Sequence, residues 1–381
     1  MKGGYLVKKR IAAVAAFIVL AGAVLFLVPG MLGAASDDSA PAAKQSRAVN
    51  ILKSMTLEEK AGQMFLVCVS SSTASEDNIA AYHPGGYLFF ADFFESRDPN
   101  SVKNMIASYQ KASTVPMLMA VDEEGGTVVR VSKFPAYRSS PFAAPQDLYE
   151  HGGLDRIRTD TVEKSDLLLA LGINVNLAPV CDMTADQQSF IYPRTLGKDK
   201  QETANYVSAV VEEMKARKIG SALKHFPGYG NNEDTHTGIA TDNRSYETFV
   251  TDDFLPFRAG IAAGAPCVLM SHNIVSCMDA DRPASLSKDA HNILRKELGF
   301  DKVVLTDDLG MDGVQGYSGG ENIAVSAVMA GNDLLCSADY EEQIPAVCRA
   351  VEEGKIPMEQ IDRSVLRILQ WKEDLGLLDN L

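Results

Sequence analysis

Residues 302–308 read KVVLTDD, a short run of branched apolar residues that ends in two aspartates. Apolar runs of this length, bounded by polar residues, are typical of strands buried in a parallel sheet. Four further runs end in ionisable or hydrogen-bonding groups. These endings are Asp122-Glu123-Glu124, Asp182, Lys224-His225 and Ser271-His272-Asn273. The repeated pattern indicates that one edge of the predicted sheet carries most of the chemistry.

Eight such runs alternate with longer amphipathic segments after residue 49, an order typical of βα units around a parallel sheet. The predicted strands cover residues 63–70, 85–90, 116–122, 173–182, 219–225, 265–272, 302–307 and 332–336. Helices are predicted between them, and a last helical face over 358–378 is expected to pack against the first elements. The count and length predict a single α/β domain at 49–381, a (β/α)8 TIM-type barrel. The alternative is a doubly wound open sheet, but no GxGxxG fingerprint follows the first strand.

In a closed barrel the C-terminal ends of all the strands meet at one mouth, where the active sites of this fold lie. We therefore expect the polar residues at the strand ends to share a pocket. The alternative is that each of them only caps the helix that follows, which is common for a single aspartate. Five polar strand ends in one chain favour the shared pocket.

The composition is that of a folded protein, since 46% of the 381 residues are apolar and 23% are charged. The formal net charge of −14 argues against a nucleic-acid partner, because phosphate backbones attract cationic surfaces. The six cysteines occur singly, without CxxC pairs, and are interpreted as mostly buried thiols. One or two disulfides are the alternative, since the N-terminus predicts export.

The N-terminus predicts a membrane-directed segment. Residues 1–10 are basic, and residues 11–35 contain no charged side chain. A helix of 18 residues spans about 27 Å, close to the ~30 Å core of a bilayer. The basic flank is expected to stay in the cytoplasm, which places everything after residue 36 outside the cell membrane. The length of the apolar segment favours a transmembrane anchor. The alternative is a signal peptide whose cleavage leaves a secreted protein. Residues 36–48 are typical of a linker.

Five motifs follow one another along the chain. They are DEEGG at 122–126 with Arg130, NLAPVCD at 176–182, Arg194 before Thr195, KHFPGYG at 224–230 followed by Asp234-Thr235-His236, and TDDLGM at 306–311. This ordered set resembles glycoside hydrolase family 3, in its β-N-acetylglucosaminidase branch. The resemblance covers essentially all of residues 50–381 and implies a hydrolase acting on a carbohydrate with a terminal N-acetylglucosamine.

Cleavage of a glycosidic bond with retention needs a nucleophile at the anomeric carbon and a proton donor for the leaving oxygen. Asp307, at a strand end, is expected to be the nucleophile, and the resemblance implies the same role. Asp308 competes for it, but its side chain is expected to point away from the mouth because successive strand residues alternate faces. The resemblance assigns the proton donor to a histidine on a mobile loop, here His236, whose imidazole Asp234 is expected to orient.

The resemblance also implies that the sugar hydroxyls are bound by Asp122, Arg130, Arg194, Lys224 and His225. An acidic acceptor and cationic donors around a polyol distinguish hydroxyl positions through paired hydrogen bonds. For Arg130, an ordinary salt bridge is the alternative. No cofactor is expected, and a metal site is not predicted because no HExxH or other paired-ligand spacing occurs.

Two positions depart from the family pattern without removing a catalytic group. Where the family usually has Gly-His-Gly, this chain has Gly228-Tyr229-Gly230, and the familiar Asp-Ser-His is Asp234-Thr235-His236. The glycines can adopt unusual backbone angles, so movement of this loop is predicted.

The leading hypothesis is a retaining exo-β-N-acetylglucosaminidase that acts on peptidoglycan fragments or other aminosugar glycans. A β-glycoside phosphorylase or a β-glucosidase-type hydrolase of the same family is the alternative, since a histidine donor carries no negative charge that repels phosphate. Two hypotheses come from other classes. One is a Schiff-base lyase or aldolase that uses Lys224, and the other is a non-catalytic module that binds cell walls.

Overall fold

The computed structural model describes residues 46–381 except 70–74, 233, 236–237, 239 and 318. Within this part eight parallel strands close into a barrel, which confirms the predicted (β/α)8 TIM-type fold. Each predicted strand segment overlaps one of them, and β5, β9 and β10 each extend one residue beyond the predicted end; the spatial order is β1-β10-β9-β7-β5-β4-β3-β2. Their bounds are β1 Phe65–Val69, β2 Gly86–Phe89, β3 Leu118–Val121, β4 Val175–Asn176, β5 Gly220–Phe226, β7 Cys267–Met270, β9 Val303–Asp308 and β10 Leu334–Ser337.

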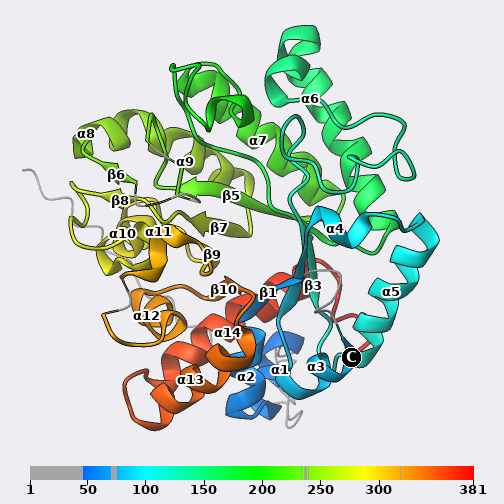
Figure 1. Ribbon diagram of the computed structural model, residues 1–381, viewed down its shortest axis with the longest axis vertical. Coiled ribbons are helices and arrows are strands. Elements are labelled where there is room, and N and C mark those ends of the chain that lie inside the picture. The colour runs from blue at the N-terminus through cyan, green and yellow to red at the C-terminus, as the bar shows by residue number, and fades with distance from the viewer. Residues whose placement is uncertain (1–45, 70–74, 233, 236–237, 239, 318) are drawn as a thin grey trace, which may run out of the picture. The chain divides into compact units, whose positions relative to one another are not determined.

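Helices surround these strands (Figure 1). The described helices are α1 Arg47–Ser54, α2 Leu57–Gln63, α3 Glu76–Tyr82, α4 Ala91–Phe94, α5 Pro99–Ala112, α6 Pro145–Ala170, α7 Lys200–Ala216, α8 Tyr246–Thr248, α9 Phe254–Ala263, α10 Lys288–Asn292, α11 Asp312–Gln315, α12 Ile323–Ala330, α13 Tyr340–Glu352 and α14 Met358–Asp374. Short 3-10 or π turns are η1 Tyr192–Arg194, η2 Phe249–Asp253, η3 Ala284–Leu286 and η4 Ile293–Glu297.

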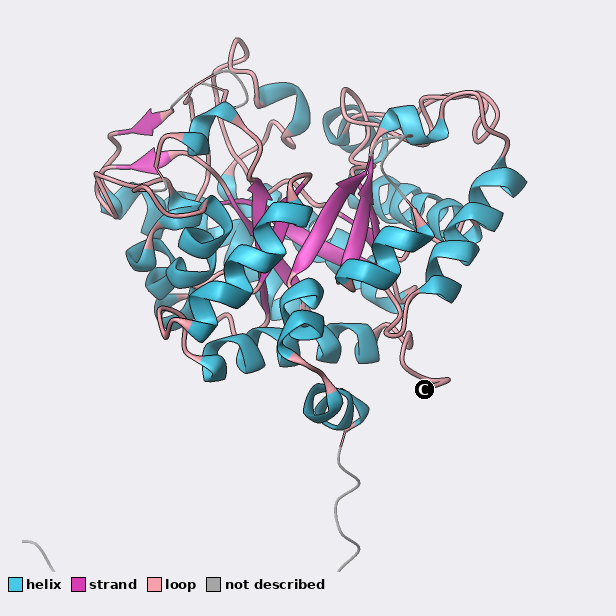
Figure 2. Ribbon diagram, turned by 60° about the horizontal axis from the view of Figure 1, so that its bottom comes forward, coloured by secondary structure: helices cyan, strands magenta, loops and turns pink. Residues whose placement is uncertain are grey.

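The mouth of the barrel is the side to which the strands point. Figure 2 shows the strand arrowheads directed toward the side on which β6 (Thr241–Asp242) and β8 (Ile274–Val275) pair as a separate two-stranded sheet. Long segments that follow β3, β4 and β5 also belong to this side, because each begins at a C-terminal strand end. Any site of this fold is expected there.

The helices begin where short polar side chains cap them. Asp98 accepts hydrogen bonds from the amides of Asn100 and Ser101 at the start of α5, and Pro99 occupies the first turn. Asp199 accepts from the amides of Gln201 and Glu202 at the start of α7. Such caps satisfy amides that have no partner within the helix.

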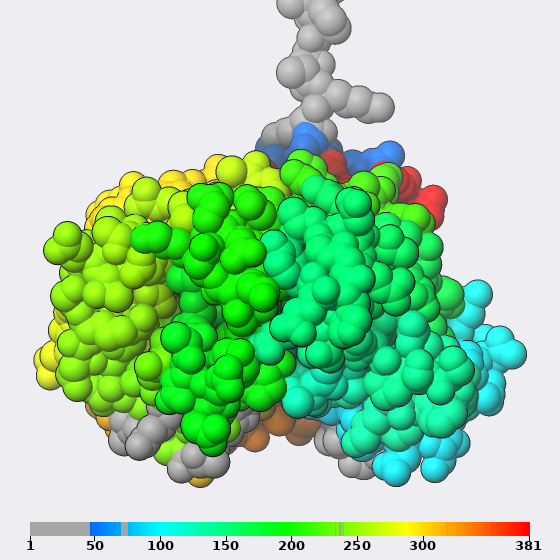
Figure 3. Space-filling model, turned by 90° about the horizontal axis from the view of Figure 1, so that it is seen from above, coloured from blue at the N-terminus to red at the C-terminus, as the bar shows by residue number. Residues whose placement is uncertain are grey.

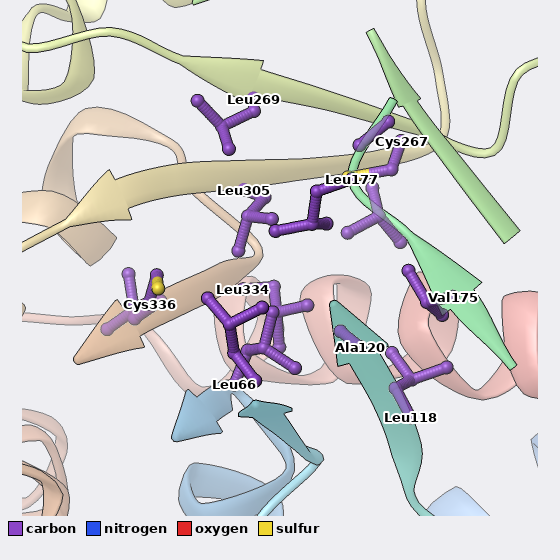
Figure 4. Close-up of a cluster of buried hydrophobic side chains, with 14 of the residues drawn as sticks. Leu66, Leu118, Ala120, Val175, Leu177, Cys267, Leu269, Leu305, Leu334 and Cys336 are labelled. Atoms are coloured by element: carbon purple, nitrogen blue, oxygen red, sulfur yellow. The ribbon is translucent and has the colours of Figure 1, made fainter. Parts of the chain in front are cut away.

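The interior of the barrel is filled by apolar side chains. Figure 4 shows Leu66, Leu118, Val175, Leu269 and Leu305, from five different strands, pointing toward one another, and all five are buried. The barrel is therefore a packed core with no open channel at this level. A site can form only above this layer, where polar side chains replace the apolar ones.

The outer helices pack against their neighbours in sequence. Figure 3 shows α6, α7 and α9 side by side on one face, as a change from blue-green to yellow-green. At the other end of the chain, α14 packs against α1, α2 and β9. This contact confirms the prediction that the last helix packs against the first elements.

The six cysteines lie in the described part, and none of them forms a disulfide. Five are buried and Cys277 is exposed, which agrees with the prediction of mostly buried thiols. The predicted membrane-directed segment at 11–35 lies outside the described residues. In the described ranges, no helix is long and apolar enough to cross a membrane.

Lys372 of α14 is a buried cation with one neutral partner. Its Nζ donates to Gln63 Oε1 at 2.6 Å, and burial lowers the pKa of the ammonium to about 7. An unfolded lysine has a pKa of about 10.4. Between these two values the unfolded chain binds more protons than the folded one, so the free energy of unfolding rises with pH.

We expect this free energy to increase by about 2 kcal/mol between pH 7 and pH 9 through Lys372 alone. Lys372→Met, which keeps the length of the side chain, should lack this increase in urea unfolding at the two pH values. Lys355→Met is the control, because Lys355 forms an exposed ion pair with Glu321 and should keep the wild-type pH dependence. Equal pH dependence in the wild type and Lys372→Met would show that the ammonium is not the source.

Candidate active site

A cavity of about 410 Å³ opens at the barrel mouth. A volume of this size suits a small-molecule ligand. Seven of the eight predicted site residues line it, and the eighth, His236, lies outside the described residues. The seven are Asp122, Arg130, Arg194, Lys224, His225, Asp234 and Asp307. Glu124, Asp308 and several apolar residues, among them Phe90, Leu177 and Met311, complete the lining.

The predicted strand ends do not all contribute equally. Asp122, the Lys224-His225 pair and Asp307 line the cavity, whereas Asp182 is buried and contacts His225. The group at 271–273 does not line it. Within that group, His272 Nδ1 is hydrogen-bonded to Ser285 Oγ at 2.7 Å, and His272 Nε2 donates to the carbonyl oxygen of Asp308 at 2.9 Å. The group at 271–273, which was expected to share the pocket, therefore supports the end of β9 instead.

One expectation about β9 is wrong, because the side chain of Asp308 does not turn away from the mouth. Leu334 of β10 pairs with Leu305, and Cys336 pairs with Asp308, so β9 has one residue more than β10 between the two pairs. Such a bulge breaks the alternation of faces. Asp307 and Asp308 both line the cavity as a result.

A second register shift has the same effect on β5. Leu223 pairs with Val268 and Phe226 with Met270 of β7, which leaves an extra residue on β5. The bulge falls on Lys224 and His225, and both line the cavity. The barrel therefore presents two consecutive side chains to the site at each of these strands.

Glu124 is the centre of a buried ionic network. Its carboxylate accepts from Arg194 through Nε at 3.0 Å and Nη2 at 2.8 Å, and Lys224 Nζ lies 2.6 Å from its Oε1. Burial alone would raise the pKa of Glu124, but the charges of Arg194 and Lys224 outweigh it and hold that pKa well below its usual range. The carboxylate is therefore ionised over the working pH range of most proteins.

Lys224 connects this network to Asp122. Its Nζ donates to Asp122 Oδ1 at 2.7 Å. Burial lowers the pKa of Lys224, but Asp122 and Glu124 raise it more, so the pKa lies above its ordinary value. Lys224 is consequently a cationic hydrogen-bond donor between two carboxylates.

His225 is held by Asp182 and Arg194. Its Nδ1 lies 2.6 Å from Asp182 Oδ2, and its Nε2 lies 3.1 Å from Arg194 Nη2. A guanidinium only donates, so Nε2 accepts and the ring hydrogen lies on Nδ1, where it donates to Asp182. This pair of contacts assigns His225 to one neutral tautomer.

Arg130 is presented by a loop that Glu123 organises. The buried Glu123 carboxylate accepts from the backbone amides of Arg130 (2.8 Å), Val131 (2.7 Å) and Ser132 (3.2 Å). The guanidinium of Arg130 lies 6.0 Å from the ring centroid of Phe90, and no partner is recorded for its Nε among the described residues. The salt-bridge alternative for Arg130 thus has no support in the described part.

At the end of β9, where the nucleophile is predicted, the two aspartates differ. Asp308 N donates to Asp307 Oδ1 at 3.0 Å, and Asp308 Oδ1 accepts from Gly310 N at 2.9 Å. Burial raises the pKa of Asp308, and the charge of Asp307 adds to the increase. Asp308 therefore holds its negative charge less readily than an exposed aspartate does.

The motifs contained three residues to which the sequence interpretation gave no site role. Glu123 and Glu124 stand in DEEGG, and Asp182 ends NLAPVCD. Their position at predicted strand ends was a usable signal, since all three are buried against residues of the site. Their partners are far away in the sequence, so the sequence pattern did not identify what they bind.

A larger hollow of about 1070 Å³ lies against the loop after β5, at Gly230, Asn231 and Asn232. None of the predicted site residues lines it. The smaller cavity is the better candidate, because ionisable groups from several strand ends converge there.

Comparison with known proteins shows the family to which the chain belongs. Residues 56–371 match the family described as Glycosyl hydrolase family 3 N terminal domain. The beta-hexosaminidase LpqI of Mycobacterium tuberculosis is 29% identical over 326 residues, which are 82% of this chain and 82% of that protein. A beta-hexosaminidase of Xylella fastidiosa is 34% identical over 290 residues, which are 71% of this chain and 82% of that protein.

The fold comparison gives the same result. The solved structure of a glycoside hydrolase family 3 beta-N-acetylglucosaminidase from Paenibacillus sp. str. FPU-7 superposes with a TM-score of 0.78 and 30% identity. The match covers 85% of this chain and 63% of that chain, so this chain spans less than two thirds of the Paenibacillus protein. The chain belongs to glycosyl hydrolase family 3 and is a glycoside hydrolase, as its motifs predicted.

Proposed function

We propose that the chain is a retaining exo-β-N-acetylglucosaminidase that removes terminal β-linked N-acetylhexosamine from peptidoglycan fragments or other aminosugar glycans. One observation carries the proposal: Asp307 and Asp234 line the same cavity as the donors Arg194 and Lys224. The relatives named beta-hexosaminidase and beta-N-acetylglucosaminidase support the same substrate class.

In the proposed reaction, Asp307 attacks the anomeric carbon and the bond to the leaving oxygen breaks. His236 gives its proton to that oxygen, so the leaving group departs as an alcohol. Water then attacks the glycosyl ester on Asp307, and His236 takes a proton from the water, which restores both side chains. Asp234, two residues before His236, holds the imidazole in the tautomer that this exchange needs.

The sugar is proposed to bind through its hydroxyls to Asp122, Arg130, Arg194, Lys224 and His225. The contacts support this, because Asp122 accepts hydrogen bonds and the nearby Lys224 and Arg194 donate them. The raised pKa of Lys224, caused by Asp122 and Glu124 against the effect of burial, argues against the Schiff-base alternative. A Schiff-base lysine must be neutral to attack a carbonyl.

A phosphorylase differs from this proposal only in the acceptor that releases the sugar from Asp307. Formation of N-acetylglucosamine 1-phosphate in phosphate buffer would favour that alternative over hydrolysis. We further propose that residues 11–35 anchor the chain in the cell membrane with the barrel outside, or are removed on secretion. The basic residues Lys8, Lys9 and Arg10 support this orientation.

The nucleophile is tested by trapping the glycosyl-enzyme. A 5-fluoro-N-acetylglucosaminyl inactivator should label Asp307, because the fluorine slows hydrolysis of the ester. Peptide mapping by mass spectrometry locates the label. Asp308→Asn is the matched control and should still be labelled at position 307, whereas Asp307→Asn should not be labelled. A label on Asp308 in the wild type would contradict the assignment.

The proton donor is tested by the acidity of the leaving group. For aryl N-acetyl-β-glucosaminides with poorly acidic leaving groups, kcat/KM, which reports departure of the leaving group, should be about 100-fold or more lower in His236→Ala than in the wild type. The deficit should shrink for dinitrophenyl glycosides, which need little protonation. His151→Ala, at an exposed position, is the control and should behave as the wild type. An equal loss on all leaving groups would sink the assignment of His236.

The network around Glu124 is tested by Glu124→Gln. A neutral amide leaves Arg194 and Lys224 with one carboxylate fewer, so we expect kcat/KM to fall about 100-fold through misplaced donors. The free energy of unfolding should fall by about 3 kcal/mol, since buried charges lose a partner. Glu321→Gln, in an exposed ion pair with Lys355, should change stability by less than about 1 kcal/mol. Wild-type kcat/KM in Glu124→Gln would show that the network does not organise the site.

A further inference from the structure

The two residues that depart from the family pattern, Tyr229 and Thr235, touch each other. The hydroxyl of Tyr229 lies 2.6 Å from Thr235 Oγ1, and both residues are buried. They stand near the two ends of the described segment that leads from β5 to Asp234 and Thr235. Their hydrogen bond therefore joins the start of this loop to the residue between Asp234 and His236.

Tyr229 contacts Asp182 and His225, beneath the proposed sugar site. Its amide donates to Asp182 Oδ1 at 2.8 Å, and the other oxygen of Asp182 accepts from His225 Nδ1. Its ring meets the imidazole of His225 edge-on, with centroids 5.2 Å apart, and meets Phe190 in the same way at 5.2 Å. Burial raises the pKa of Tyr229 well above its ordinary value, and the charge of Asp307 acts in the same direction. The phenol is therefore neutral and keeps its hydrogen bond.

Thr235 rests on the segment that follows the nucleophile. A methyl group on Gly313 of α11 would lie 2.9 Å from the carbonyl oxygens of both Thr235 and Gly238, and 3.2 Å from the Cβ of Thr235. The first distance is shorter than real Cβ contacts, so only glycine allows the loop this close. Met311 N in turn donates to the carbonyl of Asp308, so this segment is tied to the end of β9.

We propose that Tyr229, Thr235 and Gly313 are positioning residues that hold the acid–base loop at a set distance from Asp307. Tyr229 fixes the loop to the sugar site through its hydroxyl, and Gly313 lets Thr235 approach the nucleophile segment. The residues on either side of Thr235 are Asp234, which lines the cavity, and His236, the proposed donor. The inference rests on the proposed function, because it assigns the loop to proton transfer.

The hydrogen bond is tested with variants that keep volume. Tyr229→Phe and Thr235→Val each remove one hydroxyl, and Thr235→Ser keeps it. For aryl N-acetyl-β-glucosaminides with poorly acidic leaving groups, we expect kcat/KM, which reports departure of the leaving group, to fall on the order of 10-fold in the first two variants. For dinitrophenyl glycosides the change should stay within about 2-fold, because little protonation is needed. The double variant should be no slower than either single variant, since both lose the same bond, and Thr235→Ser should restore the rate.

The close approach is tested with Gly313→Ala. Gly313 lies in a helical turn without positive φ, so alanine suits its own backbone, and the added methyl acts on the loop at Thr235 and Gly238. We expect the rate to fall on the order of 10-fold, as in Tyr229→Phe and Thr235→Val, and only for substrates with poorly acidic leaving groups. Gly316→Ala is the matched control, because no atom lies within 4 Å of a methyl group there and its φ is −80°. It should behave as the wild type.

The outcomes separate the two proposals. If His236→Ala depends on the leaving group while Tyr229→Phe, Thr235→Val and Gly313→Ala do not, the positioning role is wrong and the proposed donor stands. If His236→Ala does not depend on the leaving group, the donor assignment fails and the positioning role fails with it. Equal losses on every leaving group in Tyr229→Phe, Thr235→Val and Gly313→Ala would indicate a structural role only. Thermal unfolding of each variant identifies any that does not fold, and Gly313→Ala tests the inference without altering either hydroxyl.

Discussion

The site depends on a carboxylate buried between two cations. Glu124 follows β3, Lys224 lies on β5 and Arg194 lies in the turn η1 after β4, so one ionic cluster joins three neighbouring segments of the mouth. Desolvation makes such a cluster costly, and removing one member is costlier still because it leaves a charge without its partner. The cluster therefore sets the relative positions of these segments and leaves Lys224 and Arg194 charged beside Asp122.

The second constraint is that two strands, β5 and β9, lose their regular register at the residues that line the cavity. In a regular strand, successive side chains point to opposite faces, so two consecutive residues would not both face the cavity. The extra residues of β5 and β9 bring Lys224 with His225, and Asp307 with Asp308, to the same cavity. These pairs put donors, an acceptor and the proposed nucleophile around a space large enough for one sugar.

The proposed reaction divides between a rigid and a looped part of the molecule. Asp307 belongs to a strand that is hydrogen-bonded to its neighbours, whereas Asp234 belongs to the segment after β5. A proton donor on such a segment needs contacts that bring it back to the same place at each turnover. Tyr229, Thr235 and Gly313 are proposed to supply contacts of this kind, from the proposed sugar site on one side and from the segment after the proposed nucleophile on the other.

The sequence by itself determined the eight strands and the barrel, because each strand is a local apolar run. A closed barrel gathers the residues at the C-terminal strand ends, which accounts for Asp122, Lys224, His225 and Asp307. The resemblance of the motifs to the family supplied Arg130, Arg194 and Asp234, which also line the cavity. The tertiary structure decided the rest. The direction of the Asp308 side chain follows from the pairing of β9 with β10, which depends on the register between the two strands and not on either strand alone. Glu124 pairs with Arg194 and Lys224, and Thr235 packs closely against Gly313; in each case the partner is far away along the chain. Alternation and composition act over a few residues, whereas these contacts exist only once the closed barrel has brought distant segments together.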